Sequence, residues 1–282
     1  MIPSQFDYEA PRSLSEALHL LASNAEAKIL AGGHSLLPAM KLRLAAPALL
    51  VDLSRIAGLS YIRETGNSLS IGAMTTHSDL ASSPLVRKEL PLLAETAEHI
   101  GDVQVRNRGT IGGSLAHADP AADYPASVLA LDGELIAISA HGERTIAVRD
   151  FFTGMFSTSL EANEILTEIR IAKTQGAGTA YRKFRHPASG FAVVAVAAVV
   201  RKQGAVIDNV AVGVTGVGQN PYRASAVERA LRGKALSDIS EASRHAADGI
   251  DALGDHFASA EFRKHLACVY TQRALLAAAG SK

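Results

Sequence analysis

The sequence predicts an α+β fold. Up to about residue 173, short helical and strand patterns alternate around two glycine pairs. From residue 178 onward, three long apolar strand patterns are followed only by helical patterns, an order typical of an α+β domain. With 282 residues, 48% of them hydrophobic, the chain can bury a large core and form more than one domain. We therefore expect divisions at 1–57, 58–173 and 178–282, with a polar linker before the last.

The first division begins with a capping box. Ser13 and Glu16 precede apolar residues at helical spacing, so a helix is expected over 13–22. The pair Gly32-Gly33 then separates a strand pattern from a second helical pattern. The division is expected to contain, after its first helix, a short strand at 27–31, a short helix at 36–42 and a buried strand at 48–53.

The second division mixes strands with helices. Helical spacing predicts helices at 76–81 and 85–100, the second of which ends at Gly101. The stretch 106–125 is rich in glycine, alanine and aspartate and shows little periodicity. The strands expected here are one at 68–73, a hairpin of 134–140 with 144–148 through His141-Gly142, and one at 165–171.

The third division predicts a three-stranded antiparallel sheet with helices. Gly204-Ala205 separates two long apolar patterns and suits the turn of a hairpin. Ser225 and Glu228 form a second candidate capping box. The expected strands cover 179–185, 192–203 and 206–217, and the expected helices cover 225–232, 237–249 and 260–279.

Charge, hydropathy and cysteine content exclude several functions. A formal net charge of zero argues against a nucleic-acid-binding protein. The longest apolar run, 191–200, is about half of what a bilayer crossing requires, and the N-terminus lacks the apolar region of a signal peptide, so we expect a soluble cytoplasmic protein. Cys268 is the single cysteine, so the chain cannot form an internal disulfide, hold an iron–sulfur cluster or build a cysteine-rich zinc site.

The first glycine pair lies between a strand and a helix, in the segment Ala31-Gly32-Gly33-His34-Ser35. Glycine permits positive φ angles and lets a ligand approach the backbone closely. Successive N–H groups that enter a helix N-terminus can bind an anion, and His34 and Ser35 can add side-chain donors. A pyrophosphate group suits such a segment.

The second glycine pair lies in the segment 110–123, TIGGSLAHADPAAD. We expect its backbone amides to contact the same diphosphate, with Ser114 adding a hydroxyl and Asp123 accepting hydrogen bonds from ribose hydroxyls. Simpler interpretations stay open: each pair can be an ordinary tight turn, and Asp123 can cap a helix over 124–131. Neither segment matches the G-x-G-x-x-G fingerprint or the Walker A loop.

Taken together, AGGHSLLPAMKLR and TIGGSLAHADPAADYP, about 75 residues further along, resemble the FAD-binding medium subunit of molybdenum hydroxylases, the carbon monoxide dehydrogenase and xanthine dehydrogenase family. The resemblance covers the whole chain. It implies a two-subdomain FAD-binding fold of the vanillyl-alcohol-oxidase (PCMH) type, followed by a C-terminal α+β domain.

The resemblance also implies the residues that bind FAD. The two glycine segments would line the pyrophosphate, and Leu160 would lie near the adenine. Arg182 and Lys183 would approach the pyrimidine side of the flavin. The implied set is Ala31, Gly32, Gly33, His34, Ser35, Leu36, Thr110, Gly112, Gly113, Ser114, Leu115, Ala116, Asp123, Leu160, Arg182 and Lys183. Several relatives carry acidic residues where this chain has Ser189-Gly190, which leaves the flavin-edge contacts open.

The resemblance implies a division of labour among subunits. Substrate would be oxidised at a molybdenum cofactor on a large partner subunit, and electrons would pass through [2Fe–2S] clusters on a small partner subunit to FAD, then to an external acceptor. The resemblance implies a heterotrimer, often doubled, in which this chain needs no catalytic residue or metal ligand of its own. Two alternatives remain: a self-sufficient FAD-dependent oxidase or dehydrogenase of the same fold, and a chain that has lost FAD and serves only in assembly.

Overall fold

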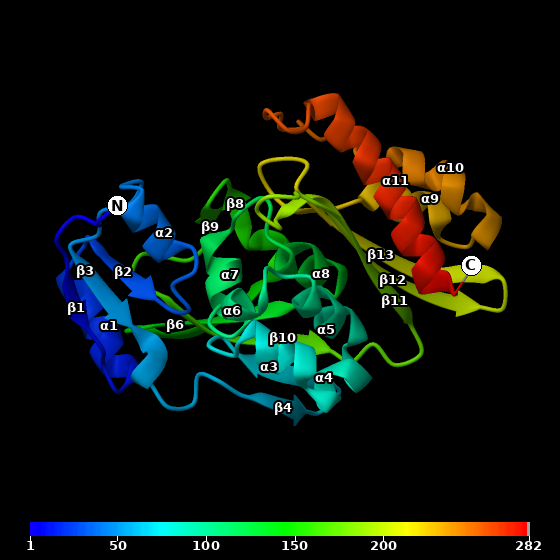
Figure 1. Ribbon diagram of the computed structural model, residues 1–282. Coiled ribbons are helices and arrows are strands. Elements are labelled where there is room, and N and C mark those ends of the chain that lie inside the picture. The colour runs from blue at the N-terminus through cyan, green and yellow to red at the C-terminus, as the bar shows by residue number, and fades with distance from the viewer. Residues whose placement is uncertain (281–282) are drawn as a thin grey trace.

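The computed structural model describes residues 1–280 and contains three main sheets that follow one another along the chain (Figure 1). The first sheet is parallel, with the order β1-β3-β2. Ser13 caps the first helix by accepting the N–H of Glu16, as the sequence predicts. The elements of this region are β1 (Asp7–Glu9), α1 (Leu14–Ser23), β2 (Ala27–Leu30), α2 (Leu36–Lys41), β3 (Leu49–Asp52) and the 3-10 turn η1 (Leu53–Arg55).

The second sheet has five strands in the order β4-β5-β10-β6-β7, and all its neighbouring strands are antiparallel. Its strands are β4 (Ile62–Thr65), β5 (Ser68–Gly72), β6 (Glu134–Ser139), β7 (Gly142–Ala147) and β10 (Ile165–Ala172). The helices between β5 and β6 are α3 (His77–Ser82), α4 (Pro84–Glu89), α5 (Pro91–Glu98), α6 (Val103–Arg106), α7 (Ile111–His117) and α8 (Tyr124–Ala130). The 3-10 turn η2 (Val148–Asp150) and a small hairpin, β8 (Phe152–Gly154) with β9 (Ser157–Thr158), precede β10.

The third sheet is antiparallel and packs between two layers of helices (Figure 1). Helix α11 covers one face, and α8 of the middle region contacts the other. Its strands are β11 (Gly178–Arg185), β12 (Ala192–Gln203), β13 (Val206–Thr215) and β14 (Tyr222–Arg223), and its helices are α9 (Ser225–Leu231), η3 (Leu236–Asp238), α10 (Ile239–Ala242), η4 (Ser243–His245) and α11 (Ala260–Ala279).

Strand β12 explains the long apolar run in the sequence. Ala195 and Ala197 belong to the core of the middle region, whereas Val194 and Val196 belong to the core beneath α11. Because successive side chains of a strand point to opposite faces, a strand covered on both faces must be apolar throughout.

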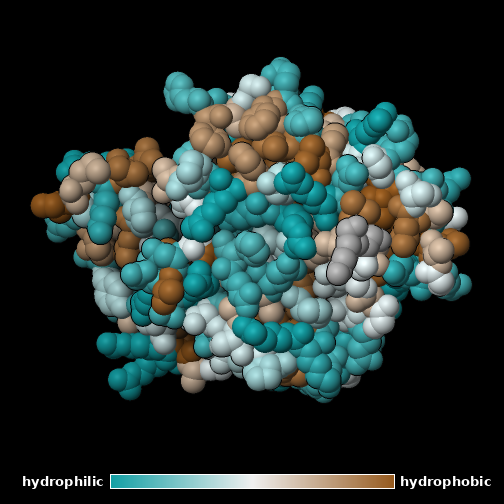
Figure 2. Space-filling model, turned by 45° about the vertical axis from the view of Figure 1, so that its right-hand side comes forward, coloured by the Kyte–Doolittle hydropathy of each residue, from teal (hydrophilic) through white to brown (hydrophobic). Residues whose placement is uncertain are grey.

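None of the helices within residues 1–280 combines the length and apolar character that a membrane crossing requires. On the face shown in Figure 2, hydrophilic residues cover the middle and hydrophobic residues gather in separate patches.

Local chemistry explains several differences from the expected elements. The helix expected over 85–100 is broken, because Pro91 has no N–H to continue α4 and instead starts α5. The C-terminal sheet has a fourth strand, the two-residue β14, beside the three that were predicted. The stretch 106–125 contains α7, which the sequence pattern did not predict.

Two predicted features of the C-terminal helices are wrong. The capping box at Ser225 does not form, because Ala224 occupies the cap position and the carboxylate of Glu228 instead binds Arg223 and the N–H of Val212. The helix expected over 237–249 is divided into two 3-10 turns and the short α10.

Candidate functional site

A cavity of about 600 Å³ lies where the first sheet meets the middle region, and it extends to the loop before β12. This volume falls within the range of cofactor sites. Both glycine segments, which were expected to share one site, line this cavity. The predicted residues found in its wall are Ala31, Gly32, Gly33, His34, Ser35, Leu36, Thr110, Gly112, Gly113, Ser114, Ala116, Asp123 and Leu160.

The first glycine segment presents a row of free backbone donors. Within residues 1–280, no acceptor receives the N–H groups of residues 32–35. Gly33 has a φ of 77°, and its carbonyl accepts the N–H of Leu37 at 3.1 Å, which starts α2. The side chains of His34 and Ser35 are exposed, and Ser35 does not cap the helix. A row of N–H groups at a helix start fits an anionic group such as a diphosphate.

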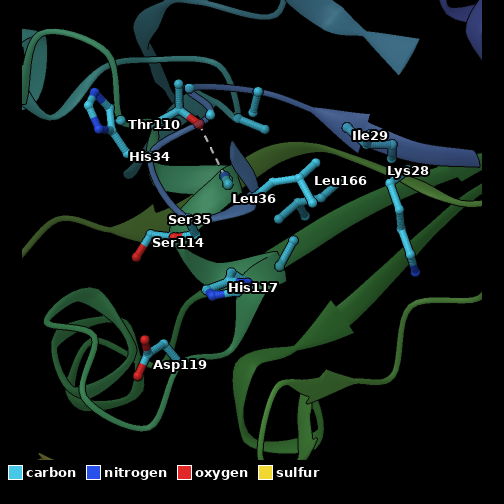
Figure 3. Close-up of a pocket in the computed structure, with 18 of the residues that line it drawn as sticks. Lys28, Ile29, His34, Ser35, Leu36, Thr110, Ser114, His117, Asp119 and Leu166 are labelled. Atoms are coloured by element: carbon cyan, nitrogen blue, oxygen red, sulfur yellow. Dashed lines mark hydrogen bonds between the residues drawn. The ribbon is translucent and has the colours of Figure 1, made fainter. Parts of the chain in front are cut away.

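The second glycine segment behaves differently, because its amides are already used within the protein. Gly112 donates to the carbonyl of Ala73 at 2.9 Å, and Gly113 donates to the Thr110 hydroxyl at 3.1 Å (Figure 3). Thr110 thereby caps α7. The expectation that both segments present bare amides is therefore wrong for the second one. What it offers a ligand is a surface without side chains and the hydroxyl of Ser114.

The first glycine segment packs against the backbone of residues 108–109, immediately before the second segment, and against Gly113 within it. A Cβ atom at Gly32 would lie 2.2 Å from the carbonyl oxygen of Arg108 and 2.7 Å from Cα of Gly109. A Cβ atom at Gly113 would lie 3.3 Å from Cβ of Ala31. Glycine is required at Gly32 because only its hydrogen allows the two chain segments to approach this closely.

The cavity changes character along its length. Ile29, Leu36 and Leu166 gather on one side, while Asp119 lies on another (Figure 3). Ile100, Val105 and Phe191 add further apolar contacts to the cavity wall. Apolar regions that flank a row of amide donors suit a molecule whose two ring systems are joined by a diphosphate.

Asp123 forms a buried cluster with two residues of β11. Its Oδ1 accepts the hydroxyl of Tyr181, and Lys183 Nζ lies 2.7 Å from Oδ1 and 2.9 Å from Oδ2. The side chains of Asp123 and Lys183 are only 5% and 2% exposed. Burial raises the pKa of Asp123, while the Lys183 ammonium and the Tyr181 hydroxyl oppose that rise. Asp123 precedes α8 without a side-chain cap bond, so the helix-cap interpretation is wrong.

Three predicted residues do not line the cavity. Leu115 is fully buried in the core of the middle region, so its side chain faces away from the cavity. Arg182 instead pairs with Glu95 at 2.9 Å, and Lys183 pairs with Asp123. Leu115, Arg182 and Lys183 thus lie outside the cavity wall, and their contact with FAD stays a prediction.

His77, the first residue of α3, lines the cavity and was not singled out in the sequence. Its backbone N–H donates to the carbonyl of Gly109, and its ring lies 5.2 Å from that of Tyr124. Nδ1 is buried without a hydrogen-bond partner among the described residues. Burial lowers the pKa of His77 to about 4, and the nearby His34 and Arg106 add to this effect. The box of Thr76 and Asp79 predicts a helix start here, but no local signal predicts that the ring is buried.

We expect His77 to make stability depend on pH. Because its pKa is about 4 in the folded chain against 6.5 ordinarily, the unfolded chain takes up the proton first as the pH falls. The stabilisation is complete above about pH 6.5 and is lost progressively down to about pH 4, for a total of about 3 kcal/mol. Urea unfolding of His77→Gln across this pH range should show a correspondingly smaller loss of unfolding free energy. His141→Gln, in the exposed turn between β6 and β7, is the matched control; an equal change in both variants would contradict the assignment.

Two family models match the chain from end to end. A model described as "FAD binding domain in molybdopterin dehydrogenase" matches residues 4–174, and one described as "CO dehydrogenase flavoprotein C-terminal domain" matches residues 179–278. The carbon monoxide dehydrogenase medium chain of Hydrogenophaga pseudoflava is 43% identical over 99% of this chain and 98% of its own. The glyceraldehyde dehydrogenase medium chain of Sulfolobus acidocaldarius is 36% identical over 97% and 98%, respectively.

Solved structures agree with these matches. The chain is similar to one in the carbon monoxide dehydrogenase of Hydrogenophaga pseudoflava that lacks the Mo-pyranopterin moiety, with a TM-score of 0.97, 43% identity and 99% of each chain covered. It is also similar to a chain of quinoline 2-oxidoreductase from Pseudomonas putida 86, with a TM-score of 0.94, 34% identity and 99% of each chain covered.

Proposed function

This chain belongs to the family of FAD-binding subunits of molybdenum hydroxylases, and on that premise we propose that it holds FAD in the cavity between its two glycine segments. The observation that carries the assignment is the row of unpaired N–H groups at residues 32–35. The residues that carry these donors line a cavity whose walls are otherwise largely apolar, and an anionic diphosphate would satisfy them.

The cavity residues divide into three groups by their proposed contacts. The amides of residues 32–35 and the Ser114 hydroxyl bind the diphosphate. The apolar side chains of Ile29 and Leu166, together with Leu160, pack against the adenosine end. Ile100, Val105 and Phe191 pack against the isoalloxazine end. In this arrangement Asp123 accepts a hydrogen bond from the bound nucleotide near the flavin end.

The chain acts as the electron-transferring subunit of a molybdenum-containing oxidoreductase. FAD exchanges one or two electrons, so it can connect one-electron carriers to a two-electron acceptor. The single cysteine excludes an iron–sulfur cluster on this chain, so the [2Fe–2S] clusters and the molybdenum cofactor belong to partner subunits of the complex. We propose a large molybdenum subunit and a small [2Fe–2S] subunit as partners, assembled as a dimer of heterotrimers. Substrate oxidation takes place on the large subunit.

We also propose that the two FAD-binding subdomains comprise 1–57 and 58–173 and that the C-terminal domain comprises 178–282. The boundary near residue 57 follows η1, where the chain leaves the parallel sheet, and the second follows β10, at the end of the five-stranded sheet. The cavity then lies between the subdomains, so its closure depends on both of them.

Flavin content tests the proposed function directly. The purified chain is expected to carry one FAD per polypeptide, measured from the visible absorbance of oxidised flavin after acid release. A flavin-free chain that also fails to bind added FAD would overturn the proposal. Metal and sulfide analysis of the native complex then separates a subunit of a molybdenum enzyme from a self-sufficient flavin oxidase, because only the former co-purifies with molybdenum and iron.

A further inference from the structure

Hydrogen bonds from the C-terminal sheet hold segment 119–123, which forms part of the cavity wall. Carbonyl oxygens of this segment accept hydrogen bonds from β12, β13 and the residue after β13. The N–H of Ala192 donates to Ala121 O at 3.2 Å, that of Gly216 donates to Pro120 O at 2.8 Å, and the Thr215 hydroxyl, with its one proton shared, lies 2.8 Å from Pro120 O and 3.0 Å from Ala122 O. Thr215 is 0% exposed, so no water competes for its hydroxyl.

The opposite side of the same segment forms part of the cavity wall. Asp119, Ala122 and Asp123 all line the cavity. Asp119 folds the segment into a turn, since its Oδ1 accepts the N–H of Ala121 at 2.8 Å and its carbonyl accepts that of Ala122 at 3.0 Å. The position of this wall is therefore set by groups that belong to the C-terminal sheet.

Strand β11 orients the side chain of Asp123, the buried charged residue of segment 119–123. Tyr181 and Lys183 are two residues apart, so they project from the same face of the strand. An ionised carboxylate offers about four acceptor positions. Tyr181 fills one on Oδ1 of Asp123, and Lys183 fills one on each oxygen. One position on Oδ2 remains for a donor from the cavity.

The residues of the C-terminal sheet that donate to segment 119–123 all lie outside the matched FAD-binding model, which ends at residue 174. We propose that the C-terminal domain is a structural part of the flavin site: Thr215, Tyr181 and Lys183 act as positioning residues that hold segment 119–123 and aim the free Oδ2 position of Asp123 at the bound nucleotide. This inference rests on the proposed function. It assigns to the C-terminal domain a role in flavin affinity beyond the contacts of its loop 189–191, which lines the cavity.

Thr215→Val tests the proposal, because valine keeps the shape of threonine and removes only the hydroxyl. Titration of FAD into the flavin-free full-length chain, followed by flavin fluorescence, is expected to show about tenfold weaker binding, as for the loss of one buried hydrogen bond. Thr215→Ser, which restores the hydroxyl, is expected to recover the affinity. The circular dichroism of the bound flavin should change with Thr215→Val and return with serine.

Thr271→Val is the matched control. Thr271 is also fully buried and lies on α11 of the same domain, but its hydroxyl has no partner within residues 1–280. Thr271→Val should leave FAD affinity unchanged. An FAD affinity that is unchanged in Thr215→Val, or lowered equally in both variants, overturns the proposal.

Tyr181→Phe provides a second test should Thr215→Val fail to fold. It removes one donor to Asp123 and keeps the ring in the core, so FAD binding is again expected to weaken about tenfold. Unchanged affinity counts against the role of Tyr181 as a positioning residue. If the unmodified chain does not bind FAD at all, the proposed function fails, and that outcome is distinct from either result above.

Discussion

Gly33→Asp is expected to give a folded chain that no longer retains FAD. The N–H of Gly33 lies within the row of four unpaired donors, so a carboxylate at this position would repel the diphosphate that those donors bind. Its φ of 77° adds strain for any side chain, and the new Cβ would lie 2.9 Å from Leu37 Cδ1. Because Leu37 Cδ1 is the end of a flexible side chain, the fold can adjust. FAD affinity should fall by more than about a hundredfold, equivalent to roughly 3 kcal/mol.

Gly58→Asp is the control for backbone strain. Gly58 has a similar φ of 84°, no atom lies within 4 Å of its added Cβ, and it does not line the cavity. Both variants therefore carry the cost of a positive φ, but only Gly33→Asp adds a charge to the proposed diphosphate site. The flavin-to-protein ratio and the thermal midpoint should be measured for each. Stoichiometric FAD in Gly33→Asp, or equal loss in Gly58→Asp, would count against the site.

The contrast between the glycine segments shows what local sequence can predict. Around Gly33, a strand, a turn and a helix follow one another within a few residues, so the sequence alone indicates free amides at a helix start. The amide of Gly112, by comparison, is taken by Ala73, which lies on the loop after β5. No local pattern reveals that acceptor, because the Ala73 carbonyl comes within hydrogen-bond distance of Gly112 only when the middle sheet packs against α7.

Burial of polar side chains was equally hard to predict. The resemblance indicated that Asp123 and Lys183 both belong near the flavin, but it did not indicate that they would bind each other. The pairing depends on how β11 lies against the loop before α8, sixty residues earlier in the chain. His77 is a similar case, since a helix-start pattern says nothing about which face of that helix becomes covered.

Lys183→Met is expected to lower the unfolding free energy by about 3–5 kcal/mol at neutral pH. Methionine has a similar length but leaves the carboxylate of Asp123 buried without its counter-charge, which is the costly way to break a buried ion pair. Adding Asp123→Asn removes the stranded charge, so the double variant should regain most of the stability. It should not regain FAD affinity, because the carboxylate acceptor is still missing.

The pH dependence of this defect distinguishes a stranded charge from lost packing. Without Lys183, burial raises the pKa of Asp123 with less opposition, so the folded variant binds a proton more readily than the unfolded chain does. The destabilisation by the unpaired Asp123 carboxylate is then absent below about pH 3.8, the pKa of Asp123 in the unfolded chain. It grows as the pH rises toward the raised pKa of Asp123 in the folded variant. The stability difference between the unmodified chain and Lys183→Met should accordingly be small near pH 4 and large at pH 7. The contribution of His77 is common to both proteins and cancels in this difference. A loss of equal size at both pH values, persisting in the double variant, would mean that the methylene packing of Lys183, and not its charge, holds β11 against Asp123.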